Sequence, residues 1–257
     1  MNNSLLFLYG FLSIFIGLGP AVIYALKKFG TKRENWISWT LGGLFWFIAY
    51  LCRLPILYFL NTSTLHQWII IYSATALAGI FETLFRIILF LSLINYTADK
   101  KGKVIMSGLG WGTIEAFILH TLAIISLMFL PNDDPTIVSL EGYEIFLLFG
   151  GIERLITEIF HILLMILVFY GIKSKLQGIS YSNPLRENFF TKYPKPEWIL
   201  LIIVGIIHFL YDLIAVSLVY VVDLITLYII LSILVGILYS YVSNRMRSFP
   251  LFPEEYK

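Results

Sequence analysis

The sequence predicts an all-α membrane protein: a polytopic bundle of about seven transmembrane helices with little mass outside the bilayer. Three observations predict it. Of 257 residues, 59% are hydrophobic and only 13% are charged, whereas soluble domains have about a quarter charged residues. Seven segments reach the roughly 20 apolar residues that a spanning helix needs. Basic residues also alternate between successive connections. We therefore expect a single integral membrane domain over 1–257.

Each apolar segment must be helical, because lipid offers no hydrogen-bond partner to an open backbone. The segments 67–97 and 144–172 are longer than a bilayer requires, so we expect them to tilt or to extend beyond the lipid. The seven expected helices lie near 5–26, 36–60, 67–97, 104–130, 144–172, 198–221 and 224–243.

The distribution of Lys and Arg predicts the orientation. Every second connection and the C-terminal tail are basic, and the connections between them contain no Lys or Arg. By the positive-inside rule this places the N-terminus outside and the C-terminus in the cytoplasm of a multi-pass cell-membrane protein. The basic residues are Lys27, Lys28, Lys32 and Arg33, then Lys100, Lys101 and Lys103, then Lys173, Lys175, Arg186, Lys192 and Lys195, and finally Arg245, Arg247 and Lys257.

Several function classes are excluded by missing signatures. The net charge of +2, without a basic run interleaved with aromatic residues, argues against nucleic acid as a partner. The zinc-protease motif HExxH, a GxSxG nucleophile elbow and a phosphate loop are absent. No Lys lies in a helix core, which excludes a retinal Schiff base. Membrane lipid is the partner that the composition implies.

Charged residues inside the expected helices are the main functional signal. Each charge at the bilayer centre costs about 2.5–3.5 kcal/mol on insertion scales, so such residues usually face one another. We expect every Arg among them to contact a carboxylate or a backbone carbonyl. These residues are Arg53, Arg86 and Arg154, with Glu82, Glu115, Glu153, Glu158 and Asp212, and with the imidazoles His120, His161 and His208.

Helical spacing predicts that many of these side chains share one site. Glu82 and Arg86 are four residues apart, and so are His208 and Asp212, which places each pair on one helix face. With alternating helix directions the groups fall at a similar depth. The sequence therefore predicts one polar cavity lined by Glu82, Arg86, Glu115, His161, His208 and Asp212.

A purely structural interpretation stays open for several of these residues. Glu82 with Arg86, and Arg154 with Glu158, have the spacing of ion pairs that fix helix packing. His120 lies off the helix face of Glu115, so we interpret it as structural.

Four motifs resemble those of the YhfC-type membrane peptidase family. The stretch 78–86, AGIFETLFR, resembles an AGxxEExxR segment, and the stretch 108–116, GLGWGTIEA, resembles a GxGHGxxEA segment. Glu153-Arg154 with His161 resembles a third motif, and the pair His208 and Asp212 a fourth. The resemblance covers roughly residues 45–215. That family is similar in turn to the CAAX-prenyl endopeptidases and the bacteriocin-processing intramembrane proteases.

The resemblance implies a peptidase acting on membrane-embedded or membrane-associated peptides. Glu82 would act as general base on a water, since a carboxylate in a dry pocket is suited to accept a proton. His161, His208 and Asp212 would form the supporting cluster that stabilises the oxyanion. Arg86 would orient Glu82, and Glu115 would share the proton or orient a His.

Two positions depart from the family pattern. Thr83 stands where the pattern has a second Glu, and Trp111 stands where it has a His. An indole neither accepts a proton at neutral pH nor binds a metal. The site is therefore either active without these groups or degenerate.

Three functional hypotheses follow. The first is an intramembrane endopeptidase that is either glutamate-dependent or metal-dependent; in the metal variant His161, His208 and Asp212 would bind a divalent ion such as zinc. The second is a non-catalytic interaction or immunity-type protein on a peptidase scaffold. The third is a proton-coupled transporter, because buried Glu, His and Asp residues also form proton relays.

Overall fold

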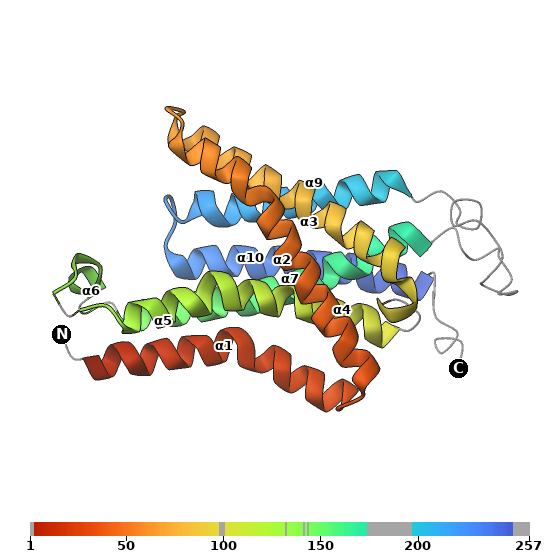
Figure 1. Ribbon diagram of the computed structural model, residues 1–257, viewed down its shortest axis with the longest axis horizontal. Helices are drawn as coiled ribbons and strands as arrows, with labels where there is room; N and C mark the ends of the chain where they lie inside the picture. Colours follow the sequence, from red (N-terminus) through yellow and green to blue (C-terminus); the bar gives the residue numbers. More distant parts are fainter. Residues whose placement is uncertain are drawn as a thin grey trace, which may run out of the picture.

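The structure is a computed structural model that describes residues 3–97, 101–131, 133–140, 142, 144–173 and 197–248. Over these residues it is helical and contains no strand. The first helix begins and the last helix ends at opposite ends of the molecule (Figure 1). The elements are α1 Asn3–Phe29, α2 Arg33–Thr62, α3 Gln67–Thr97, α4 Lys101–Glu115, the π-helical turn η1 Ala116–Thr121, α5 Leu122–Met128, α6 Pro135–Leu140, the 3₁₀ turn η2 Glu144–Phe146, α7 Leu147–Lys173, α9 Trp198–Leu218 and α10 Leu224–Ser248.

Seven helices in the described ranges are long and apolar enough to cross a membrane, which confirms the predicted fold class. Their bounds follow the predicted segments closely, with two differences. The segment predicted at 104–130 is interrupted by the π turn η1. The connection after it contains the short helix α6, which begins at Pro135. Its first turn is capped by Asp134, whose side chain accepts a hydrogen bond from Thr136 N at 2.8 Å.

Part of the predicted charge alternation lies outside the described residues. It comprises residues 98–100 before α4, residues 174–196 between α7 and α9, and the tail after residue 248. The basic residues concerned are Lys100, Lys175, Arg186, Lys192, Lys195 and Lys257.

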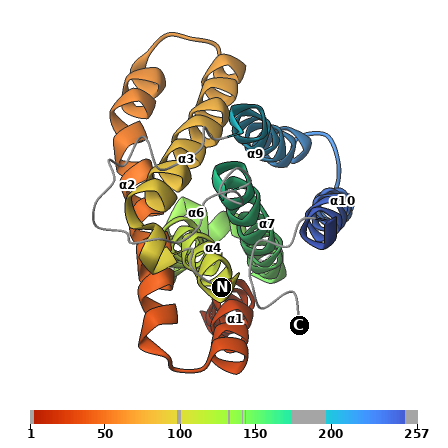
Figure 2. The same cartoon turned by 90° about the vertical axis from the view of Figure 1, so that its right-hand side faces the viewer.

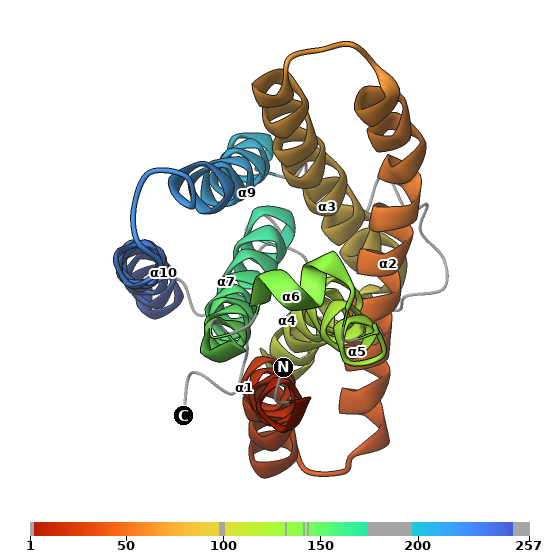
Figure 3. The same ribbon diagram turned by 90° about the vertical axis from the view of Figure 1, so that its left-hand side faces the viewer.

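Helix α7 forms the centre of the bundle. The most apolar window of the span that contains α7 is 78% buried, far more than that of any other span. Helix α7 packs against α1, α3, α4, α9 and α10, and Figures 2 and 3 show it between α4 on one side and α9 and α10 on the other. Its buried side chains include Leu164, Leu167 and Val168. A polar residue on α7 is therefore withdrawn from lipid on most sides.

Small residues bring α2 and α4 into backbone contact. A side chain added at Gly42 would overlap the carbonyl group of Ser107, and one added at Gly110 would overlap the carbonyl oxygen of Trp39. Close approach through small residues is a common packing mode of membrane helices. This contact places Trp111, the neighbour of Gly110, inside the bundle, where its side chain is fully buried.

Candidate functional site

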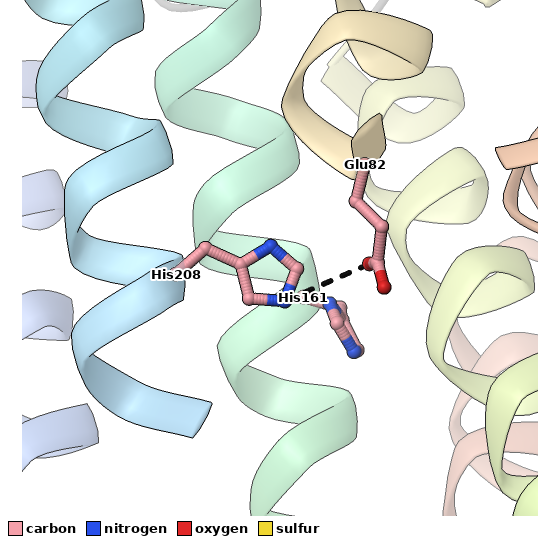
Figure 4. A group of neighbouring side chains, drawn as sticks. All are labelled: Glu82, His161 and His208. Atoms are coloured by element: carbon pink, nitrogen blue, oxygen red, sulfur yellow. Dashed lines mark ion pairs between the residues drawn. The ribbon is translucent and has the colours of Figure 1, made fainter. Parts of the chain in front are cut away.

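Ionisable side chains from five helices meet in the middle of the bundle. Arg53 comes from α2, Glu82 and Arg86 from α3, and the others from α4, α7 and α9. Figure 4 shows Glu82, His161 and His208 directed toward one another from three separate helices. We call the following set the polar cluster: Arg53, Glu82, Arg86, Trp111, Glu115, Glu153, Arg154, His161, His208 and Asp212.

Both carboxylate oxygens of Glu82 are bound by donors. Oε1 accepts a hydrogen bond from Arg53 Nη1 at 3.2 Å. Oε2 accepts one from Trp111 Nε1 at 3.0 Å and one from Arg86 Nη2 at 3.4 Å. His208 Nε2 lies 3.6 Å from Oε2, which is longer than a hydrogen bond. The expected contacts of Arg53 and Arg86 with a carboxylate are confirmed.

Arg86 joins the two imidazoles. Its Nη2 lies 2.7 Å from His161 Nδ1, and its Nη1 lies 3.3 Å from His208 Nδ1. A guanidinium only donates hydrogen bonds, so both Nδ1 atoms must accept. The ring hydrogen of each neutral imidazole then resides on Nε2. The plane of Arg86 also lies over the ring of Trp111, 4.2 Å from its centroid, which is cation–π geometry.

A second set of contacts continues from His161 toward the ends of α4 and α7. His161 Nε2 lies 2.7 Å from Glu115 Oε2, although the two atoms lack hydrogen-bond alignment. Glu115 Oε1 accepts a hydrogen bond from Arg154 Nη1 at 3.2 Å. Arg154 Nε donates to Glu153, its neighbour in sequence. Every Arg of the cluster therefore contacts a carboxylate, as the cost of an unpaired charge predicts.

Two hydroxyl groups extend the cluster. Thr157 donates to Glu153 Oε1 at 2.9 Å and lies 3.3 Å from the hydroxyl of Tyr211. Tyr211 precedes Asp212, whose Oδ2 is 3.5 Å from His208 Nε2. Neither Thr157 nor Tyr211 was predicted from the sequence. Thr157 lies four residues after Glu153 on the same helix face, which was a usable signal.

The cluster is sealed at its centre and partly accessible at one side. The Arg86 side chain is 0% exposed, whereas those of Glu115 and Asp212 are 12% and 27% exposed. Glu115 lies near the end of α4 and Asp212 in the second half of α9, so the accessible members face the end of the bundle opposite the basic connections. The prediction that these ionisable side chains meet at one site is confirmed. That these side chains line an open cavity stays a prediction.

Glu158 does not form the ion pair that its spacing suggested. Arg154 is directed to Glu115 and Glu153 instead, and no hydrogen-bond donor in the described ranges reaches either carboxyl oxygen of Glu158. Thr113 is close, but its hydroxyl donates to Leu109 O at 2.7 Å. Helical spacing permitted the pair, whereas the side-chain conformation of Arg154 prevents it. The interpretation of an Arg154–Glu158 pair was therefore wrong.

The π turn moves His120 away from the position that α-helical spacing implied. His120 Nε2 lies 2.9 Å from Ser13 Oγ on α1, and its ring adjoins Gly17 and Gly150. Ser13 in turn donates to Leu147 O. His120 thus ties α1 to the start of α7, which agrees with the structural interpretation.

The grouping of metal-capable residues differs from the predicted set. Ligand atoms of Glu82, His161 and His208 lie within 4.8 Å of one another, and all three residues are buried. Asp212 is not part of this group, although it contacts His208. Glu82 therefore takes the place that the sequence analysis gave to Asp212.

No family model, curated protein or solved structure matches this chain. The fold and the cluster together define its class: a multi-pass helical membrane protein whose core holds a network of arginines, carboxylates and imidazoles. The resemblance to the YhfC-type peptidases stays a prediction.

Proposed function

We propose that this protein is an intramembrane peptidase-like hydrolase of the cell membrane, with Glu82 as its base. One observation carries the proposal: a carboxylate and two imidazoles from α3, α7 and α9 meet at a buried site in the centre of the bundle. Ionisable groups are costly inside a membrane, and where they gather they commonly mark a functional site. The resemblance of the four motifs to those of membrane peptidases supports the same function.

The hydrolytic step follows from the groups around Glu82. A water oxygen attacks the peptide carbonyl carbon while its proton passes to Glu82, and the His208 Nε2–H stabilises the negative oxygen. The C–N bond then breaks, and the proton on Glu82 passes to the leaving nitrogen. Glu82 Oε2 and His208 Nε2 lie 3.6 Å apart without a hydrogen bond between them. We therefore place the reacting water on this side.

A divalent metal does not fit the arrangement as it stands. Glu82, His161 and His208 have the spacing of a ligand set. Arg86, however, donates to Glu82 and faces Nδ1 of both imidazoles, so a permanent cation competes for the same lone pairs. We therefore derive no step through a metal.

The test is cleavage of a mixture of membrane-anchored peptides by the purified protein in lipid, read by mass spectrometry. Wild type should release products, and Glu82→Gln should release at most about one hundredth of them, since losing a general base costs about 10²–10⁴-fold. Glu34→Gln, at an exposed carboxylate of α2, is the matched control and should retain activity. Metal analysis of the same preparation should find no stoichiometric zinc.

A second candidate, a non-catalytic protein on the same scaffold, is favoured by Trp111. Its indole donates to Glu82 Oε2 and packs against Arg86, so it occupies space beside the base without offering a proton acceptor. The double variant Thr83→Glu/Trp111→His restores the family pattern. Cleavage by the double variant alone would identify a degenerate enzyme. Absence of cleavage by both proteins would favour the non-catalytic candidate.

A further inference from the structure

A groove on the face of α7 opposite the polar cluster has the shape and charge of a lipid site. Its volume is about 640 Å³, within the range of small-molecule sites. Ile159, Ile162 and Ile166 lie along its floor on α7. These residues recur at helical spacing, and His161 lies on the other side of the same helix.

The walls of the groove come from helices that do not close over it. Tyr24 of α1 and Ile105 of α4 line one side, and Tyr239 and Val242 of α10 line the other. Figure 2 shows α10 to the right of α7 and α1 below it. Tyr24 and Tyr239 are 45% and 60% exposed, so the groove opens sideways to the surroundings of the bundle. In a membrane, lipid acyl chains surround the bundle at this depth.

The mouth of the groove carries two basic side chains. Lys101, at the start of α4, and Arg247, near the end of α10, both line it, and none of the described residues that line it is Asp or Glu. Both lie at the end of the bundle where the basic connections gather. The N-terminus of α4 adds the positive end of a helix dipole. An apolar groove that ends at two basic side chains complements an acyl chain that carries an anionic headgroup.

We propose that this groove binds an anionic phospholipid of the surrounding membrane. The headgroup phosphate lies between Lys101 and Arg247, and one acyl chain lies along α7 over Ile162. This site is separate from the polar cluster, because it uses the opposite face of α7. Its occupancy therefore does not depend on the proposed hydrolytic activity.

The experiment is native mass spectrometry of the full chain after incubation with equal amounts of phosphatidylglycerol and phosphatidylcholine of identical acyl chains. Wild type should retain phosphatidylglycerol preferentially. A basic residue near an anionic lipid contributes about 1 kcal/mol, or about fivefold in affinity. Lys101→Gln/Arg247→Gln should therefore lower the preference about 25-fold.

Two further variants make the result specific to the groove. Ile159→Trp should fill it and remove the retained lipid; Ile159 is 43% exposed, so the fold should tolerate the larger side chain. Lys27→Gln/Lys28→Gln removes two exposed charges at the same end, outside the groove lining, and should leave the preference unchanged. Equal retention of both lipids by wild type, an unchanged preference in the Lys101/Arg247 variant, or a retained peptide in place of lipid would overturn the proposal.

Discussion

At the scale of single residues, Arg86 is the side chain on which the polar cluster depends. Its two terminal nitrogens reach Glu82, His161 and His208, and its face covers Trp111. The contacts fix which nitrogen of each imidazole carries the hydrogen. They also neutralise part of the carboxylate charge that the bundle encloses. Arg86 therefore both holds the cluster together and sets its chemistry.

Replacing Arg86 by Met should lower the free energy of unfolding by about 3–5 kcal/mol, because removing one partner of a buried ion pair leaves the other charge uncompensated. Reversible unfolding in mixed micelles measures the change. Arg33→Met, at an exposed position of α2, should change stability by less than about 0.5 kcal/mol. A loss below about 1 kcal/mol for Arg86→Met would show that the cluster reorganises without its central cation.

Residue spacing predicted part of this cluster and missed the rest for a clear reason. The pairs Glu82–Arg86 and His208–Asp212 lie within one helix, so periodicity alone places them together. The partner of Arg154 could not be chosen in this way, because Glu158 on its own helix and Glu115 on α4 were both within reach. The choice depends on a side-chain conformation and on how α4 packs against α7, which one sequence does not specify.

At the scale of elements, the close contact of α2 with α4 positions Trp111 and Glu115. Gly110 meets the backbone of α2 in this contact, because it has no side chain to hold the two helices apart. The π turn that follows Glu115 was not predicted. A π turn differs from α-helix by one inserted residue, and no residue type marks it in the sequence.

Gly110→Ala should lower the free energy of unfolding by about 1–3 kcal/mol, since the added methyl group overlaps a backbone carbonyl that cannot rotate away. Gly236→Ala in α10 is the matched control. No heavy atom lies within 4 Å of its added methyl group, so it should leave stability unchanged or raise it slightly. Equal effects of the two substitutions in unfolding experiments would contradict the described α2–α4 contact.

The start of α10 should depend on pH through Asp223. Its carboxylate accepts hydrogen bonds from Thr226 N at 2.9 Å and from Thr226 Oγ1 at 2.7 Å. These bonds lower the pKa of Asp223 below its ordinary value of 3.8. A lowered pKa in the folded state means that the stabilisation is present at neutral pH and is lost as the pH falls through that lowered value.

Hydrogen exchange at the first turn of α10 measures this effect. Protection in wild type should fall on acidification below the ordinary range of Asp. Asp223→Asn keeps a capping side chain without a titrating group, so its protection should show no such step. Dividing the exchange rate of wild type by that of the variant at each pH removes the intrinsic pH dependence of exchange. A constant ratio would show that Asp223 does not cap α10.

At the scale of the whole molecule, composition was sufficient to predict the fold class. A bundle of spanning helices is the one architecture that seven apolar segments of this length can adopt, and the described residues form seven such helices. The arrangement of these helices was not predictable. Every span is apolar on most sides, so hydropathy did not reveal that α7 occupies the centre of the bundle and α10 its edge.

The orientation stays a prediction that a reporter can test. A reporter active only outside the cytoplasm should be inactive when fused after Lys257, and active when inserted at Gly142, between α6 and α7. The reason is the placement of Lys and Arg in every second connection. Activity at the C-terminal fusion would reverse the orientation and would place the accessible side of the polar cluster toward the cytoplasm.

We propose that Glu82 activates a water within the membrane. The most direct test is cleavage of a membrane-anchored peptide in water enriched in heavy oxygen, followed by mass spectrometry of the new carboxyl terminus. Wild type should incorporate one heavy oxygen atom per bond cleaved, and Glu82→Gln should incorporate it at a rate about 10²–10⁴-fold lower. Incorporation at the same rate by both proteins would contradict the assignment of Glu82 as the base.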